Sequence, residues 1–397
     1  MLSADQLLEA LLERARSLTA TETVGVTSAL KRVLAVTQVS PIAVPPLDNS
    51  AMDGYALRVA DVPSAGVRLP VAQRIPAGAV GEPLAAGTAA RIFTGAPVPP
   101  GADAVLMQED CAAEGDTVVV HKLPHPGENI RRAGEDIAVG AEVLPAGTRI
   151  GPAEMGLAAS IGLPELPVFK QLKVACFFTG DELVAPGIPL KPGQIYNSNR
   201  YTLHGLLNDL GCELIDFGIV PDTLEATEAA ISGAASIADV VITSGGVSVG
   251  ESDFVRAAVE RLGSIEIWKA AMKPGKPIAY GRVGDADFIG LPGNPVSALV
   301  TFGLFARPFL LARMGASRTL YRAFRMQADF AWPKPGTRRE FLRARIQPDG
   351  RLGLFPNQGS GVLTSCAWAD GLVDVEIGHT VAPGDWVRFI PFTELLA

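Results

Sequence analysis

The strongest local signal in the sequence is Thr243-Ser244-Gly245-Gly246-Val247-Ser248-Val249-Gly250, at residues 243–250. It follows an apolar run at 239–243 that predicts a strand, and it precedes a helical pattern at 253–262. Three glycines in such a turn let the backbone approach a ligand closely and direct several N–H groups toward one anion. The spacing is neither G-x-G-x-x-G nor a P-loop, so the turn predicts an anion site without naming the anion.

The sequence on either side of this turn alternates between strand and helix. Short apolar runs predict strands at 173–178, 213–217, 239–243 and 287–290, and helical patterns fall at 200–210, 224–235, 253–262 and 295–311. This alternation favours a parallel sheet with helices on both faces. Ligands of such sheets bind beyond the carboxyl ends of the strands.

Three further strand exits carry polar residues. Thr179-Gly180-Asp181-Glu182-Leu183 and Asp222 place carboxylates there, which either cap turns or hold a hard cation such as Mg²⁺. In Leu291-Pro292-Gly293-Asn294-Pro295, Asn294 suits an N-cap and Pro295 a first helical position. We expect this helix start to present exposed N–H groups at the same edge of the sheet.

Basic side chains gather between Trp268 and Pro277, at Lys269, Lys273 and Lys276. Two prolines and a glycine prevent the segment 273–277 from forming a helix interior. The alternatives are a solvated loop and a loop that holds ammonium groups in place for an oxyanion.

Composition limits the classes of function. The formal net charge of −8 argues against nucleic-acid binding, which depends on neutralising phosphates. Four cysteines without a CxxC pair and four dispersed histidines give no zinc or haem signature and favour reduced thiols in the cytoplasm. The most apolar stretch, 296–306, is too short for a membrane span and is expected to end at Arg307 and Pro308.

With 397 residues, the chain predicts two to four domains. A capped amphipathic helix at 3–17 and a second helix at 151–161 are expected to lie side by side in one discontinuous domain, residues 1–40 and 141–169. This domain brackets a β-rich insert at 41–140 and is followed by the α/β domain at 170–320. Residues 321–397 predict a small β-barrel or sandwich.

Seven ordered segments resemble the molybdopterin molybdotransferases, the MoeA family that includes the gephyrin E domain. They are DNSAMDGYA (48–56), RIFTGAPVP (91–99), NIRRAGED (129–136), TGDEL (179–183), TSGGVSVGESDF (243–254), MKPGKP (272–277) and LPGNPVSA (291–298). The C-terminal region matches least well and rests on residues 339–341 and 357–361.

The resemblance implies an α/β multidomain fold with a molybdopterin-binding domain, a β-rich insert, a discontinuous linker domain and a C-terminal β-barrel-like domain. It implies a cytoplasmic homodimer that inserts molybdenum from molybdate into adenylylated molybdopterin, with Mg²⁺-dependent release of AMP. The implied partners are the adenylyltransferase that supplies the substrate and molybdoenzyme maturation proteins.

The expected site residues fall into three groups. The catalytic set is Asp53, Thr94, Arg131, Asp136, Lys269, Lys273 and Lys276. The cofactor-binding set is Ser244, Gly245, Gly246, Ser248, Gly250, Pro292, Gly293, Asn294, Pro295, Arg339 and Ser360. The metal set is Glu182, Asp222 and Asp253. The alternatives are a molybdopterin adenylyltransferase and a non-catalytic scaffold of the gephyrin kind.

Overall fold

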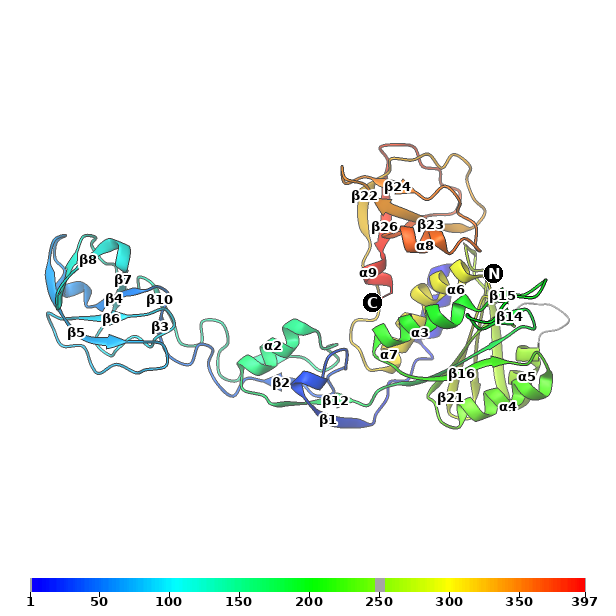
Figure 1. Cartoon of the computed structure of the whole chain (residues 1–397), viewed down its shortest axis with the longest axis horizontal. Coiled ribbons are helices and arrows are strands. Elements are labelled where there is room, and N and C mark those ends of the chain that lie inside the picture. Colours follow the sequence, from blue (N-terminus) through cyan, green and yellow to red (C-terminus); the bar gives the residue numbers. More distant parts are fainter. Residues whose placement is uncertain (1, 247–253, 397) are drawn as a thin grey trace.

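The structure is a computed structural model that describes residues 2–246 and 254–396. Figure 1 shows an elongated molecule with a β domain at one end and a small module containing α2 in the middle. The largest sheet and the C-terminal β domain lie together at the other end. The chain therefore separates the insert from the rest of the molecule by a narrow connection.

The central sheet has six strands in the order β16-β13-β17-β21-β20-β18. The strands are β13 (Lys173–Thr179), β16 (Glu213–Val220), β17 (Val240–Ser244), β18 (Gly263–Lys269), β20 (Pro277–Val283) and β21 (Ala286–Leu291). The first four strands in the order run parallel, whereas β20 and β18 are antiparallel to their neighbours. The predicted parallel strands are confirmed, but the antiparallel edge is missing from the sequence-based prediction.

Helices cover both faces of this sheet. They are α3 (Ser198–Leu210), α4 (Leu224–Ala235), α5 (Phe254–Leu262), α6 (Pro295–Thr301) and α7 (Arg307–Arg313). Along β13, Val174, Cys176 and Phe178 join the core with α3, α6 and α7, while Ala175 and Phe177 join the core with α4 and α5. Successive side chains on a strand point to opposite faces, so one apolar run supplies both cores.

The helix predicted at 295–311 begins at Pro295 and ends at Arg313, two residues beyond the predicted end. A π-helical turn, η4 (Phe302–Ala306), links α6 to α7, so the helical stretch passes Arg307 and Pro308 and ends at Arg313. Pro308 follows the π-helical turn directly, at the second position of α7. The stretch Pro295–Arg313 is long and apolar enough to cross a membrane, but 89% of it is buried within the protein, as in a core helix.

The N-terminal helix and the middle module are separate. Helix α1 (Ala4–Leu12) has the predicted capping box between Ser3 and Gln6, and it buries Leu7 and Leu11 against the core of α7. Helix α2 (Pro152–Ser160) instead belongs to a core with Leu34, Leu144 and Leu166. The expectation that the two helices lie side by side is therefore wrong, because the apolar stripe of α1 is already buried on the α/β domain.

Small paired strands complete the middle module. They are β1 (Thr21–Gly25) with β12 (Glu165–Phe169), and β2 (Gln38–Val39) with β11 (Glu142–Leu144); η1 (Val26–Ser28) lies nearby. The two chain segments of this module are distant in sequence.

The insert is built on a second six-stranded sheet, ordered β7-β4-β6-β5-β9-β8. Its strands are β4 (Gly54–Leu57), β5 (Arg68–Ile75), β6 (Ala89–Ile92), β7 (Ala104–Met107), β8 (Cys111–Glu114) and β9 (Thr117–Val120). Two strands pair beside this sheet, and two short 3₁₀ turns connect its strands: β3 (Asn49–Ser50) with β10 (Ile130–Arg131), η2 (Val59–Asp61) and η3 (Gln108–Asp110).

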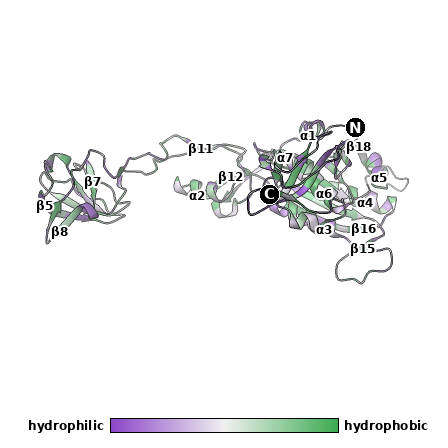
Figure 2. Ribbon diagram, turned by 90° about the horizontal axis from the view of Figure 1, so that it is seen from above, coloured by the Kyte–Doolittle hydropathy of each residue, from purple (hydrophilic) through white to green (hydrophobic). Residues whose placement is uncertain are grey.

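The C-terminal sheet includes one short strand whose residues belong to the α/β domain. Its order is β19-β23-β25-β26-β22, with β24 paired to β23. The elements are β19 (Met272–Lys273), β22 (Phe324–Gln327), β23 (Arg339–Ile346), β24 (Leu352–Leu354), β25 (Gly371–Val375), β26 (Trp386–Pro391), α8 (Thr364–Trp368) and α9 (Phe392–Leu395). Figure 2 shows hydrophobic residues in the strands and helices around the central sheet and also in the strands of the insert. We propose domain boundaries near residues 40, 140, 170 and 320, with α1 assigned to the α/β domain.

Candidate functional site

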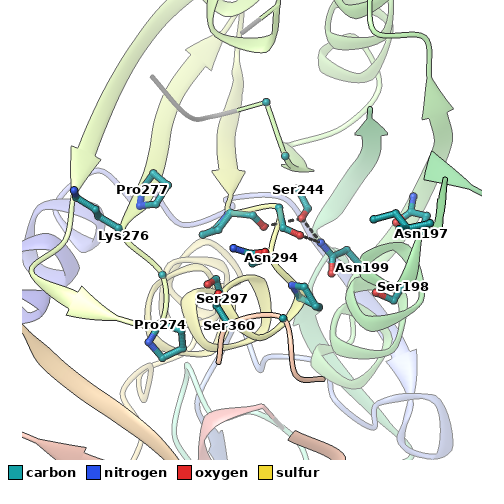
Figure 3. Close-up of a pocket in the computed structure, with 18 of the residues that line it drawn as sticks. Asn197, Ser198, Asn199, Ser244, Pro274, Lys276, Pro277, Asn294, Ser297 and Ser360 are labelled. Atoms are coloured by element: carbon teal, nitrogen blue, oxygen red, sulfur yellow. Dashed lines mark hydrogen bonds between the residues drawn. The ribbon is translucent and has the colours of Figure 1, made fainter. Parts of the chain in front are cut away.

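A cavity of about 890 Å³ opens at the carboxyl ends of β13, β17 and β21. Residues from seven chain segments line it, and Figure 3 shows part of this lining. Three segments are the strand exits, and the others are residues 195–199 at the start of α3, the loop 273–277, Arg338 and the C-terminal segment 358–361. The short strand β14 (Leu183–Val184) follows the first exit, and β15 (Ile195–Tyr196) precedes α3. The cavity therefore brings together Glu182, the first half of the glycine turn and the lysine loop, as the sequence predicts.

Ser244 is fixed at the floor of this cavity by side-chain hydrogen bonds. Its Oγ donates to Pro292 O at 2.9 Å and accepts from Asn199 Nδ2 at 2.8 Å. Asn199 Nδ2 also donates to Gly293 O at 2.7 Å (Figure 3). The amide of Asn199 thus ties two strand exits to the start of α3.

Asn197, Ser198 and Asn199 line the cavity but were not expected from the sequence. Asn197 is the N-cap of α3, and its side chain accepts the N–H of Arg200. The signal was present in the polar run before the predicted helix at residue 200, because Asn and Ser favour helix starts. Nothing in that run, however, indicates that the helix start faces a ligand cavity.

The glycines of the turn are required by close packing. Gly246 has a positive φ of 64°, and a Cβ there would collide with the side chain of Val255. Gly245 also has a positive φ, and its N–H donates to Leu291 O at 3.0 Å. The predicted residues Ser248, Gly250 and Asp253 lie outside the described residues.

Two of the three predicted metal ligands lie at or beside the cavity. Glu182 lines it with an exposed side chain, and Asp222 Oδ1 accepts a hydrogen bond from Thr179 Oγ1 at 2.9 Å. Within residues 2–246 and 254–396, no cluster of three potential metal ligands is found. The two carboxylates supply hard oxygen donors of the kind that Mg²⁺ prefers.

The lysine loop contributes unequally to the cavity. Lys273 and Lys276 line it, whereas Lys269 does not and belongs to the antiparallel edge strand β18. Lys276 is exposed, and its ammonium points away from Asn294 and Ser297 in Figure 3. Lys273 forms an ion pair with Glu340, with 3.3 Å between Nζ and Oε1.

The expected helix start at Asn294 differs from the prediction in two respects. Asn294 is the N-cap of α6, followed by Pro295, but its side chain makes no capping hydrogen bond. The N–H of Val296, expected to be exposed, donates to Ser360 O at 3.0 Å. The C-terminal domain therefore closes one wall of the cavity by bonding directly to the start of α6.

Arg343 holds the C-terminal segment in this position. It is fully buried, and it donates from Nη2 to Gly359 O at 3.1 Å and from Nε to Ser365 Oγ at 3.0 Å. Its backbone exchanges hydrogen bonds with the side-chain amide of Gln358. These contacts position Ser360, which lines the cavity as predicted.

Arg339 does not line the cavity, although it was expected to bind the cofactor. Its guanidinium is buried and donates two hydrogen bonds of 2.6 Å to Asp374, with Asp5 of the N-terminal helix as a further partner. Arg338, one residue earlier, lines the cavity instead. Alternation along the strand separates the two side chains, and the loose sequence match could not fix that register.

Asp53, Thr94, Arg131 and Asp136 belong to the insert and lie far from the cavity within one chain (Figure 1). Asp53 Oδ1 accepts from both the N–H and the hydroxyl of Thr94 at 2.8 Å, and these hydrogen bonds hold the pKa of Asp53 below its usual value. Arg131 and Asp136 are exposed. The structure therefore joins Asp53 to Thr94 but does not join this group to the lysine loop.

Comparisons with known families cover most of the chain. Residues 2–162 match the MoeA N-terminal region (domain I and II), residues 175–312 match a probable molybdopterin binding domain, and residues 325–392 match the MoeA C-terminal region (domain IV). The three matches follow one another along the chain without overlap.

Relatives and solved structures agree with these matches. The molybdopterin molybdenumtransferase of Haemophilus influenzae is 47% identical over the full length of both chains, and molybdopterin molybdenumtransferase 2 of Mycobacterium tuberculosis is 41% identical over 89% of this chain and 90% of its own. A crystal structure of a molybdopterin biosynthesis MoeA protein from Pyrococcus horikoshii has 33% identity and a TM-score of 0.77, covering 99% of both chains. A second structure of that name has 28% identity and a TM-score of 0.83, covering 98% of this chain and all of its own.

Proposed function

The chain belongs to the MoeA family of molybdopterin molybdenumtransferases, transferases of molybdenum cofactor biosynthesis, and we propose that it inserts molybdenum from molybdate into adenylylated molybdopterin with release of AMP. One observation carries the proposal. The single 890 Å³ cavity contains the Ser244–Gly246 turn, the lysine loop and the Glu182 carboxylate. Two anionic reactants need such a collection of cationic and N–H groups before they approach each other.

Cationic groups supply the attraction for the anions. Lys273 and Arg338 line the same part of the cavity, since Arg338 Nη1 donates to Met272 O at 3.4 Å, next to Lys273. Molybdate is a dianion, so charges fixed beside it before binding lower the cost of bringing it to the pterin adenylate. At the floor of the cavity, Asn199 Oδ1 is buried without a hydrogen-bond partner among the described residues and would accept a hydrogen bond from the polar edge of the pterin.

Magnesium would be held by Glu182 and Asp222, together with Asp253 from outside the described residues. When bound, Mg²⁺ would stabilise the negative charge that develops as the phosphoanhydride breaks. Thr179 donates its hydroxyl to Asp222 and thereby keeps one carboxylate oxygen directed to this edge of the sheet. We propose that no side chain of the protein forms a covalent bond to the substrate.

The insert residues require a second chain. Asp53, Thr94, Arg131 and Asp136 are too far along the elongated molecule to reach the cavity of their own chain. A homodimer in which each insert faces the partner's cavity would complete both sites by symmetry. We propose this arrangement, in the cytoplasm, with the substrate supplied by a molybdopterin adenylyltransferase and the product passed to molybdoenzyme maturation proteins.

One assay separates the proposal from its alternatives. Purified protein receives adenylylated molybdopterin, molybdate and Mg²⁺, and both AMP release and cofactor formation are followed. AMP release that depends on molybdate supports the proposal. Consumption of ATP with free molybdopterin would indicate an adenylyltransferase. Absence of both reactions would favour the non-catalytic scaffold.

A further inference from the structure

The lysine loop begins at β19, a short strand that pairs with the C-terminal sheet. β19 pairs in parallel with β23, so that Lys273 lies directly opposite Glu340. The N–H of Arg339 donates to Ala271 O at 2.9 Å and extends this pairing. Because strand hydrogen bonds fix the two backbones together, the C-terminal domain sets the position of the Lys273 backbone beside the cavity.

Glu340 faces Lys273 from a nearly buried position. The side chain of Glu340 is 12% exposed, that of Lys273 is 47% exposed, and Nζ lies 3.3 Å from Oε1. Among the described residues, Lys276 and Arg338 have no carboxylate within ion-pair distance. The cavity therefore holds one lysine whose charge is shared with a carboxylate, beside two cations whose charge is not shared.

The carboxylate of Glu340 is itself fixed. Its Oε2 accepts a hydrogen bond of 2.6 Å from Trp332 Nε1. Trp332 is anchored by two backbone hydrogen bonds to Val381, of 2.7 and 3.0 Å. A carboxylate held from behind in this way limits the positions that the flexible lysine side chain can adopt.

We propose that Glu340 is a positioning residue, which holds the Lys273 ammonium at the cavity wall and restrains the affinity of the cavity for free molybdate. The inference rests on the proposed function. A neighbouring carboxylate competes with the anionic substrate for the same ammonium in the ground state. The same carboxylate also keeps that ammonium in one place. The positive charge is therefore already in position when molybdate meets the pterin adenylate.

The test is Glu340→Gln, which removes the charge and keeps an acceptor for Trp332. We expect kcat for AMP release to fall about tenfold while the KM for molybdate falls two- to threefold. A merely structural role would lower kcat and raise KM together. Trp332→Phe, which frees the carboxylate but keeps its charge, should lower kcat without lowering KM.

A double-mutant comparison shows whether the effect passes through Lys273. In a Lys273→Ala background, Glu340→Gln should leave the equilibrium affinity for molybdate unchanged, because the restrained group is gone. Glu376→Gln removes a carboxylate of the C-terminal domain that contacts Arg339 and not Lys273, and it should behave as wild type. Equal effects of Glu340→Gln with and without Lys273 would overturn the inference.

Equilibrium binding of molybdate alone keeps the inference independent of turnover. Glu340→Gln should bind molybdate two- to threefold more tightly than wild type, and Lys273→Ala more weakly. Unchanged or weaker binding by Glu340→Gln would contradict the inference even if wild type released no AMP. Absence of AMP release in wild type would instead contradict the proposed function.

Discussion

Two neighbouring arginines at the start of β23 have different roles. Arg339 is buried, and its bidentate pair with Asp374 joins the C-terminal sheet while its contact with Asp5 joins the N-terminal helix. Arg338 lies at the cavity and has no carboxylate partner among the described residues. The first arginine therefore serves stability, and the second is available to an anion.

Substitution of each arginine by alanine should separate these roles. Arg339→Ala leaves the buried carboxylate of Asp374 without its main partner and should lower the free energy of unfolding by about 3–5 kcal/mol. Arg338→Ala should leave stability within about 0.5 kcal/mol of wild type and weaken molybdate binding about tenfold. Urea unfolding and equilibrium binding measure the two effects. An exchange of the two outcomes would place the functional arginine at residue 339, as the sequence suggested.

The cysteine side chains are poor nucleophiles. Burial raises the pKa of the Cys111 thiol to about 11, with the Asp110 carboxylate adding to the effect, and burial raises the pKa of Cys212 to about 12. Cys176 and Cys366 are also buried, and their pKa values are raised as well. This agrees with the proposal that no covalent bond to the protein forms during the reaction.

Alkylation of Cys111 should show this raised pKa directly. Because the thiolate is the reactive form, the rate with iodoacetamide should keep rising up to about pH 11 instead of levelling near pH 9. A protein that keeps only Cys111, with the other cysteines replaced by serine or alanine, gives the profile by mass spectrometry. A plateau of the alkylation rate near pH 8 would show that the thiol is activated. It would contradict the argument against a covalent bond between the protein and the substrate.

At the residue scale, the sequence predicts those side chains whose position follows from a strand exit. Ser244 is the last residue of β17, Glu182 and Asn294 lie three residues beyond the ends of β13 and β21, and topology alone brings such ends together. Arg339 could not be assigned correctly, because one residue of register decides which face of a strand a side chain occupies. Asn199 was missed because its partners, Ser244 and Gly293, are distant in sequence.

Among the elements, the lysine loop depends on a glycine. Gly275 has a positive φ of 93°, and a Cβ at this position would collide with Thr301 Oγ1 of α6. The loop therefore rests against the helix only because residue 275 has no side chain. This packing holds Lys273 and Lys276 on one side of the cavity.

Gly275→Ala should move the loop and weaken anion binding. We expect a loss of about 1–3 kcal/mol in stability and a clear loss of molybdate affinity. Gly284→Ala is a matched control, because Gly284 also has a positive φ but no atom lies within 4 Å of its added Cβ. The control should lose stability and keep molybdate affinity. Wild-type affinity in Gly275→Ala would show that the contact with α6 does not position the lysines.

Element types were predicted well wherever periodicity was strong. The four parallel strands and the helices α3 and α4 fall close to their predicted ranges, since alternating apolar runs and helical patterns are local signals. The antiparallel strands β18 and β20 were missed because they flank the Pro- and Gly-rich lysine loop, which dominates the local pattern. The π-helical turn before Arg307 has no simple sequence signal.

On the scale of the whole molecule, the insert and the cavity are at opposite ends of one chain (Figure 1). The order of the sequence motifs predicts both parts but not the distance between them, because distance depends on how the narrow middle module extends. The C-terminal domain contributes more residues to the cavity than its weak sequence match suggested. It supplies Arg338, Ser360 and the strand that pairs with β19.

The most direct test of an active site shared between two chains is complementation between variants. Asp53→Ala removes a group of the insert, Lys273→Ala removes a group of the cavity, and each protein alone should be folded and nearly inactive in molybdate-dependent AMP release. Co-expressed in equal amounts, the two chains should recover about a quarter of wild-type activity, because half of the dimers carry one intact site out of two. A mixture that remains as inactive as its parents would show that the insert and the cavity do not form one site.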